Sequence, residues 1–136
     1  MVLGPRVMRV LKAATTESLA ELRAAGRKVV IIEPIPHPPF DPIQCLSHAE
    51  VLEECRYPVT ATPDWLELFY RQLARNDKGV VSAHFDRLIC PFLPICDPIV
   101  NNQIVSWDQT HLTASFAKTL APVIDDYLKQ TGILPR

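Results

Sequence analysis

The sequence predicts an α/β fold in which parallel β-strands alternate with α-helices. Two apolar runs, at residues 28–33 and 80–85, indicate strands, and segments with helical periodicity lie before, between and after them. An order of helix, strand, helix, strand and helix is typical of parallel strands joined by right-handed crossovers.

The chain has 136 residues, the length of one domain, and we take residues 1–136 as that domain. Two strands are too few for a covered parallel sheet, because each would keep an unpaired edge. We therefore interpret the chain as the second half of a doubly wound domain.

The first helix is predicted at residues 5–25. Pro5 suits the first turn of a helix, and Gly26 suits the left-handed residue that follows the end of one. The strand at 28–33 has no polar alternation, which is typical of a strand covered on both faces. The apolar residues of the helix recur at spacings of three and four; they are Val7 or Met8, Leu11, Leu19 and Leu22.

A stiff loop is predicted at Pro34–Pro42, because each proline removes a hydrogen-bond donor and constrains the residue before it. This loop follows the first strand at its carboxyl end, where open α/β sheets place their ligand sites. We expect residues 44–60 to form short helix and loop.

A second helix is predicted to begin at Thr62-Pro63-Asp64, with Thr62 as the capping hydroxyl and Pro63 in the first turn. It ends within residues 76–79, and the second strand follows at 80–85. The apolar stripe of this helix consists of Trp65, Leu66, Phe69 and Leu73.

The C-terminal part begins with a loop at 90–97 that contains two cysteines. Residues 101–105 are expected to form a short edge hairpin or an extended piece. The last helix is predicted at 114–130, where Pro122 either bends it or lies on its exposed side, and Gly132 ends it.

The net charge of -1 gives no electrostatic reason to expect nucleic acid or an anionic membrane as a partner. No run of residues is long and apolar enough to span a membrane. The opening segment, 1–26, mixes charged with apolar residues and lacks the apolar core of a signal peptide.

The four cysteines fall into two local pairs. Cys45 and Cys55 flank one short loop, and Cys90 and Cys96 flank another. Two local disulfides would suit an oxidising compartment, and four unpaired thiols are the alternative. A zinc site fits less well, because the spacings lack the short knuckle that zinc ligands form. The presence of disulfides and the absence of a signal peptide are compatible with each other if the chain is the tail of a longer protein.

The segment Ser106–Thr113 contains an aspartate three residues before a histidine, directly ahead of the last helix. In a hydrolytic triad, a carboxylate such as Asp108 would hold the imidazole of His111 in one tautomer, so that the ring can take a proton from a nucleophile. The alternative makes Asp108 a turn residue and His111 a surface residue.

A nucleophile is not evident in the sequence. None of the serines lies in a G-x-S-x-G turn, and no glycine-rich loop offers backbone N–H groups to an oxyanion. The asparagines at a helix end and in a loop are not well supported as oxyanion donors. The serines are Ser18, Ser47, Ser82, Ser106 and Ser115, and the asparagines are Asn76, Asn101 and Asn102.

Three features together resemble the C-terminal part of an SGNH hydrolase domain. They are the run Val29–Pro36, the cysteine pairs in proline-rich loops, and Trp107-Asp108-Gln109-Thr110-His111-Leu112-Thr113. The chain is most similar to the SGNH domain fused behind the acyltransferase-3 membrane module of bacterial surface-polysaccharide O-acyltransferases. The likeness spans roughly residues 10–130, and Trp107 stands where relatives usually carry another aromatic residue.

The resemblance implies a three-layer αβα, flavodoxin-like fold with a Ser-His-Asp triad at the carboxyl edge of the sheet. The aspartate and histidine of the triad would be Asp108 and His111, and the disulfides would be Cys45–Cys55 and Cys90–Cys96. The serine, glycine and asparagine blocks of the family lie N-terminal to the part represented here. The 136 residues would therefore be a partial domain that lacks its nucleophile block and is inactive alone.

The resemblance also implies an esterase or acyltransferase outside the cytoplasmic membrane, in the periplasm or cell envelope. Its substrate would be an acylated glycan or a small acyl ester, and its partner the missing N-terminal half or a membrane acyltransferase module. No cofactor or metal is implied. Two alternatives remain: a non-catalytic, disulfide-stapled module that binds through the loops Pro34–Pro42 and Cys90–Cys96, and a gene remnant without an independent role.

Overall fold

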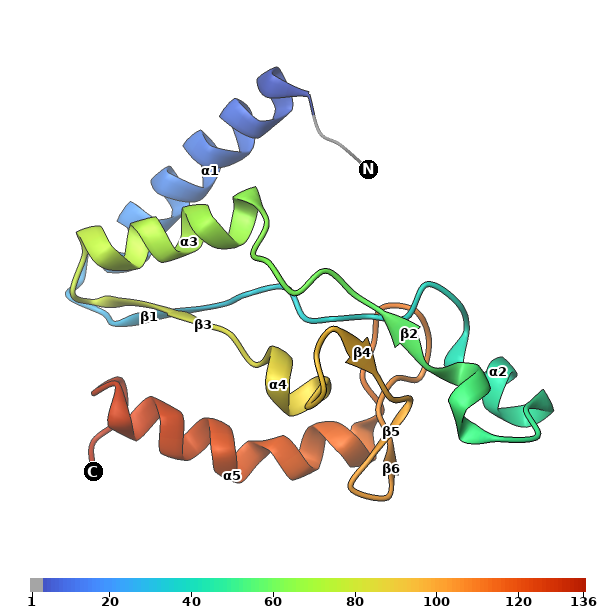
Figure 1. Cartoon of the computed structure of the whole chain (residues 1–136). Coiled ribbons are helices and arrows are strands. Elements are labelled where there is room, and N and C mark those ends of the chain that lie inside the picture. The colour runs from blue at the N-terminus through green and yellow to red at the C-terminus, as the bar shows by residue number, and fades with distance from the viewer. Residues whose placement is uncertain (1–3) are drawn as a thin grey trace. The chain divides into compact units, whose positions relative to one another are not determined.

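The computed structural model describes residues 4–136, which divide into two compact units. The sheet unit comprises the described residues up to Ile32 together with Asp64–Ala83. The disulfide unit comprises Glu33–Pro63 and His84–Arg136. Figure 1 shows the course of the chain through both units.

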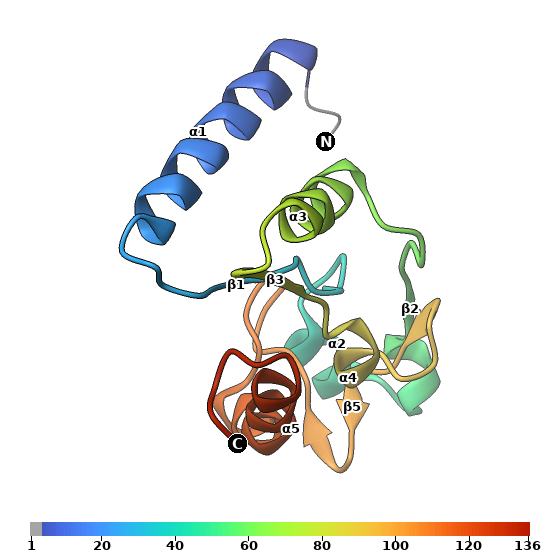
Figure 2. The ribbon, with the colours of Figure 1, turned by 90° about the vertical axis from the view of Figure 1, so that its left-hand side faces the viewer.

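The sheet unit is built from two helices and two strands. The helices are α1 (Pro5–Arg23) and α3 (Trp65–Asn76), and the strands are β1 (Val29–Ile32) and β3 (Val80–Ala83). The strands pair in parallel, with Val29 opposite Val80 and Ile32 opposite Ala83. The predicted parallel pairing is therefore confirmed, and helix α3 packs on this sheet (Figures 1 and 2).

The prediction that the first strand is covered on both faces is wrong. The first three residues of β1 are half-buried, and Ile32 keeps 60% of its surface exposed. A two-stranded sheet has no interior strand, so the side chains of β1 lack the neighbours that a wider parallel sheet would provide.

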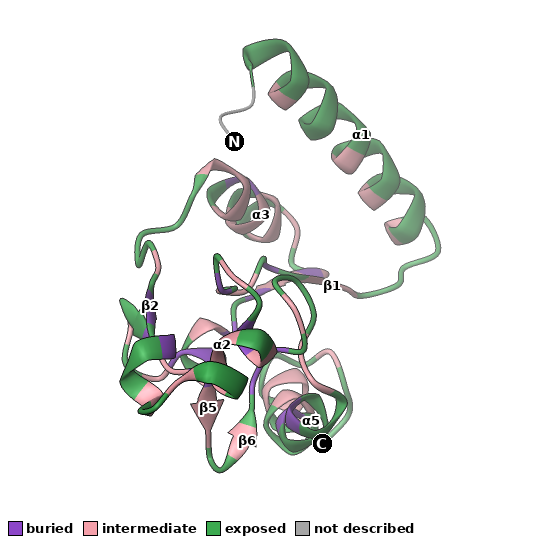
Figure 3. Cartoon of the chain, turned by 90° about the vertical axis from the view of Figure 1, so that its right-hand side faces the viewer, coloured by how far each residue is buried: buried purple, intermediate pink, exposed green. Residues whose placement is uncertain are grey.

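Helix α1 buries none of its described residues, as Figure 3 shows. Its last residue, Arg23, donates from Nε and Nη2 to the two carboxylate oxygens of Asp77, at 2.9 and 3.0 Å. This charge-assisted pair holds the pKa of Asp77 below its ordinary value. The Arg23 guanidinium lies against Gly79, the residue that precedes β3. Lys12 lies over the ring of Phe69, 5.3 Å from its centroid.

The cap of helix α3 is Asp64 rather than the predicted Thr62. The Asp64 carboxylate accepts hydrogen bonds from the backbone N–H of Leu66 and of Glu67, at 2.8 and 3.0 Å. Glu67 completes a capping box by accepting from the Asp64 N–H at 2.7 Å. The carboxylate satisfies two backbone donors of the first turn and faces the positive end of the helix dipole.

Replacing Asp64 with alanine should lower the free energy of unfolding by about 1 kcal/mol, because it leaves the first-turn N–H groups without their protein acceptor. Glu67→Gln is the matched control, because glutamine keeps the reciprocal bond of a capping box. Urea unfolding monitored by circular dichroism measures both. An equal loss in the two variants would show that charge near the helix start, rather than the cap, is what matters.

The disulfide unit contains short elements and one long helix. They are α2 (Pro42–His48), the 3-10 helix η1 (Leu52–Cys55), β2 (Tyr57–Pro58), α4 (Asp86–Ile89), β4 (Ile95–Cys96), β5 (Ile99–Val100), β6 (Gln103–Ile104) and α5 (Ala114–Gln130). Strand β2 pairs antiparallel with β4, and β5 pairs antiparallel with β6. The β5–β6 hairpin realises one of the two forms expected for residues 101–105. The loop predicted at 90–97 contains the short strand β4.

Two disulfides lie in this unit. Cys45 is joined to Cys55 and Cys90 to Cys96, with Cα–Cα separations of 5.9 and 4.8 Å. Cys55, Cys90 and Cys96 are completely buried. Tyr57 packs with the second disulfide, and the half-buried side chains of Phe40, Val59 and Leu93 surround this cluster. The second disulfide is therefore part of the hydrophobic core.

Helix α5 has the bounds that the sequence predicted. Thr113 caps it by accepting from the Phe116 N–H at 3.2 Å, and Gly132 follows its end with a φ of +73°. Phe116 is buried on its inner face, whereas Pro122 lies on its exposed side without interrupting the helix. Among the residues from 4 to 136, no helix is long and apolar enough to cross a membrane.

Candidate functional site

The site predicted from the sequence lies in a closed loop between β6 and α5. Ser106 forms an antiparallel bridge with Leu112, and the N–H of Trp107 donates to the carbonyl of His111 at 2.8 Å. The N–H of Thr113 donates to the carbonyl of Val105 at 2.9 Å. Val105 and Ser106 are buried, so the base of the loop is anchored in the unit while its tip projects outward.

Asp108 organises the tip of this loop. Its Oδ1 accepts from the backbone N–H of Thr110 and of His111, each at 2.7 Å, and from the Thr110 hydroxyl at 3.2 Å. These bonds, led by that of the Thr110 N–H and followed by that of the His111 side chain, hold the pKa of the Asp108 carboxyl well below its usual range. Asp108 is therefore a turn residue, as the alternative interpretation expected, and it is also a hydrogen-bond partner of the His111 imidazole.

The imidazole of His111 is fixed through one of its two nitrogens. Nδ1 lies 2.8 Å from Oδ2 and 3.0 Å from Oδ1 of Asp108, so the ring donates from Nδ1 to the carboxylate. Within residues 4–136, Nε2 makes no hydrogen bond, and 75% of the side chain is exposed. In the neutral ring, a proton on Nδ1 leaves a lone pair on Nε2, which is the form that a general base needs.

The Asp108 carboxyl should titrate below its ordinary pKa of 3.8, because the folded loop donates hydrogen bonds to its ionised form. Since the pKa is lowered in the folded state, the carboxylate stabilises the loop fully above the unfolded value and loses this effect as the pH falls through the folded value. An NMR titration that follows the Asp108 Cγ measures the pKa of this carboxyl. An unstructured peptide of residues 105–113 is the control, and equal midpoints in peptide and protein would contradict the prediction.

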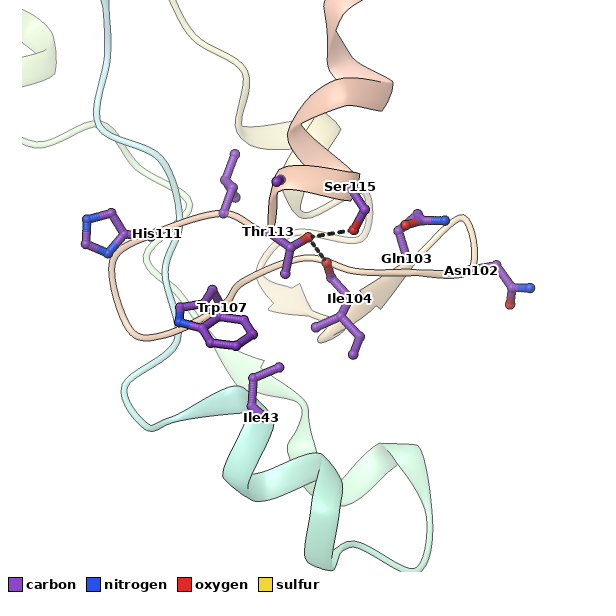
Figure 4. A pocket seen from close by; sticks show the side chains of 10 residues that line it. Ile43, Asn102, Gln103, Ile104, Trp107, His111, Thr113 and Ser115 are labelled. Carbon is purple, nitrogen blue, oxygen red and sulfur yellow. Dashed lines mark hydrogen bonds between the residues drawn. The ribbon is translucent and has the colours of Figure 1, made fainter.

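A pocket of about 650 Å³ opens beside this loop, and we call it the Trp107 pocket. Figure 4 shows the Trp107 indole between His111 on one side and Asn102 and Gln103 on the other. Among the residues that line the Trp107 pocket, His111 alone has an ionisable side chain. The pocket is lined by Ile43, Asn102, Gln103, Ile104, Trp107, His111, Leu112, Thr113, Ala114 and Ser115.

The serines of the disulfide unit do not complete a triad with His111. Ser115 lines the pocket, but its hydroxyl contacts the Thr113 hydroxyl at 3.3 Å and lies well away from His111 (Figure 4). Ser47 bonds to the carbonyl of Gln44 at 2.8 Å on helix α2. Ser106 is buried at the base of the loop.

The asparagine pair that the sequence left without a role forms the turn of the β5–β6 hairpin. Asn101 and Asn102 have φ angles of +49° and +63°, the left-handed region that a two-residue hairpin turn requires. Asparagine tolerates this region better than most residues, which explains the Asn-Asn sequence. The same turn places Asn102 beside the Trp107 pocket. The pocket residues Ile43, Gln103 and Ile104 were not predicted, because Ile43 lies in α2 and the other two lie in β6, sixty residues further along the chain.

Fold and site together describe a mixed α/β protein with a small parallel sheet, two disulfides and a carboxylate–histidine pair of the kind found in hydrolytic triads. The chain belongs to the family of SGNH domains fused to AT3 domains, whose model matches residues 5–126. Comparison with curated proteins gave no match. Comparison with solved structures also gave none.

Proposed function

We propose that this chain is the C-terminal half of an SGNH-type acyl-esterase or O-acyltransferase domain that acts on acyl esters of cell-surface glycans outside the cytoplasmic membrane. In this proposal the domain is a three-layer αβα fold, and β1 and β3 are two strands of its sheet. The unpaired edges of these strands and the exposed Ile32 support a sheet that further strands complete.

The observation that carries the proposal is the geometry of His111. Its Nδ1 is bound to Asp108 at 2.8 Å, while Nε2 is open beside a pocket. Families that use this pair place a serine at Nε2. We assign that serine to the N-terminal half of the domain, because none of the three serines of the disulfide unit bonds to His111.

The Asp108–His111 pair takes part in both halves of the proposed reaction, the transfer of the acyl group to the serine and its transfer from the serine. Nε2 of His111 takes the proton of the serine hydroxyl as its oxygen bonds to the acyl carbonyl carbon, and Asp108 stabilises the imidazolium that results. The imidazolium then gives the proton to the leaving oxygen of the acyl donor as the original ester bond breaks. Water or a sugar hydroxyl next attacks the acyl-serine and passes its proton to His111, and the imidazolium returns that proton to the serine oxygen as the acyl–serine bond breaks.

The experiment compares this chain alone with a single polypeptide that joins it to the serine-bearing half of an SGNH domain. A fluorophosphonate probe labels activated serines, and para-nitrophenyl acetate reports hydrolysis. We expect neither signal from the chain alone and both from the joined polypeptide. Hydrolysis by the chain alone that His111→Ala abolishes would contradict the proposal. An in-frame Gly-Asp-Ser block upstream of Met1, preceded by apolar spans, would support it.

The disulfides and the fusion to AT3 domains in the family support an extracytoplasmic location. Small disulfide-bonded domains persist in oxidising compartments and are rare in the cytosol. A membrane acyltransferase module would then be the partner that delivers the acyl group, and a surface glycan would be the acceptor.

A further inference from the structure

We propose that the Trp107 pocket binds a segment of an uncharged glycan, in which one sugar ring stacks on the Trp107 indole and a neighbouring ring hydrogen-bonds through its hydroxyls to Asn102 and Gln103. This inference rests on the proposed function, because it assigns the part of the glycan substrate that lies beside His111.

The lining of the pocket matches the two kinds of surface that a sugar ring carries. A pyranose presents apolar C–H groups on its faces and hydroxyls on its rim. The pocket offers an apolar strip of Ile43, Ile104 and Trp107, and a polar end at Asn102 and Gln103. Ligand sites of this type combine apolar and aromatic walls with a few polar groups that set orientation.

Trp107 is held in place and yet open. Its backbone is fixed by the hydrogen bond to His111, whereas 65% of its surface is exposed. Within the described part of the chain, the indole N–H makes no hydrogen bond. An exposed indole on a closed loop offers a rigid apolar face that can be covered with little loss of conformational entropy.

The two amides are also fixed and open. Asn102 lies in the left-handed turn of the hairpin and Gln103 begins β6, so hairpin geometry sets both backbone positions. Neither side chain forms a hydrogen bond with any residue between 4 and 136. An amide both donates and accepts hydrogen bonds, as a hydroxyl does, so each amide can donate to a sugar hydroxyl or accept from it.

Charge and shape distinguish a sugar from the other candidates. No Asp, Glu, Lys or Arg lines the pocket, so a charged ligand would find no counter-charge there. A simple acyl chain would cover the apolar strip but leave both amides without a partner from the ligand. The volume of about 650 Å³ lies within the range of small-molecule sites and is much larger than an acetyl group requires.

The test exploits the presence of two tryptophans in the sequence. In a Trp65→Phe variant of the whole chain, Trp107 is the single indole, and its emission reports directly on the pocket. We expect neutral oligosaccharides such as chitotriose and cellotriose to shift this emission to the blue and to protect it from acrylamide quenching. Methyl hexanoate is the acyl-chain comparison.

Ligand-observed NMR extends the test to variants that lack the indole. Trp107→Ala should weaken oligosaccharide binding at least tenfold, while Trp107→Phe should retain it within about threefold, because a phenyl ring still offers a flat apolar face. Gln103→Ala should weaken binding as well. Phe92→Ala is the matched control, because Phe92 is an exposed aromatic residue outside the pocket.

The inference is overturned if no oligosaccharide of the panel perturbs Trp107, or if methyl hexanoate perturbs it and the sugars do not. Equal loss of binding in Phe92→Ala would also overturn it. The binding measurements on the whole chain require no catalysis, so they separate this inference from the proposed function. Sugar binding to the chain, with no turnover by the joined polypeptide, would support this inference and contradict the proposed function. Turnover by the joined polypeptide, with no sugar binding at Trp107, would do the reverse.

Discussion

His111→Ala should reduce acyl-ester turnover by at least about a thousandfold in a polypeptide that joins this chain to the serine-bearing half. The reason is that the imidazole carries the proton in both halves of the proposed reaction, and no other base bonds to Asp108 among the described residues. Steady-state hydrolysis of para-nitrophenyl acetate measures this effect as a fall in kcat.

Asp108→Asn and His48→Ala refine the interpretation of that loss. Asparagine keeps an oxygen for the N–H groups of Thr110 and His111, so the loop should hold, but the imidazole loses its anionic partner. We expect kcat to fall by about two to four orders of magnitude in this variant, with KM little changed. His48 is an exposed histidine on helix α2, outside the Trp107 pocket. A comparable loss in His48→Ala would refute the assignment of His111.

Phe116→Ala should lower the free energy of unfolding of the disulfide unit by about 3–5 kcal/mol. Phe116 lies in the first turn of α5 and keeps only 1% of its surface exposed. Its removal takes an aromatic ring from the core and leaves a cavity. Urea unfolding, followed by Trp107 emission in the Trp65→Phe background, measures the change within this unit.

The matched control is Phe92→Ala, which removes the same side chain from a position that is 73% exposed. We expect its free energy of unfolding to change by no more than about 0.5 kcal/mol. Similar values for the two variants would show that α5 is not anchored through Phe116.

The three long helices and the two parallel strands could be predicted because each has a signal within its own sequence, whereas the short helix α4 was not predicted. Helix α5 matches its predicted span, 114–130, and the parallel β1–β3 pair follows from strands that alternate with helices. The strands β2 and β4 were not predicted. Each has two residues, too few for any periodicity, and they form because the chain around Tyr57 packs on the buried Cys90–Cys96 disulfide.

The sequence by itself determined the Asp108–His111 pair, because three residues in one tight turn bring a carboxylate to an imidazole without help from distant segments. The Thr113 cap of α5 and the Asn101-Asn102 turn also depend on local backbone geometry, although neither was predicted. Only the tertiary structure decided the Trp107 pocket, since Ile43 comes from α2 while Gln103 and Trp107 follow some sixty residues later. Their proximity results from packing within the disulfide unit, and no spacing along the chain encodes such a contact.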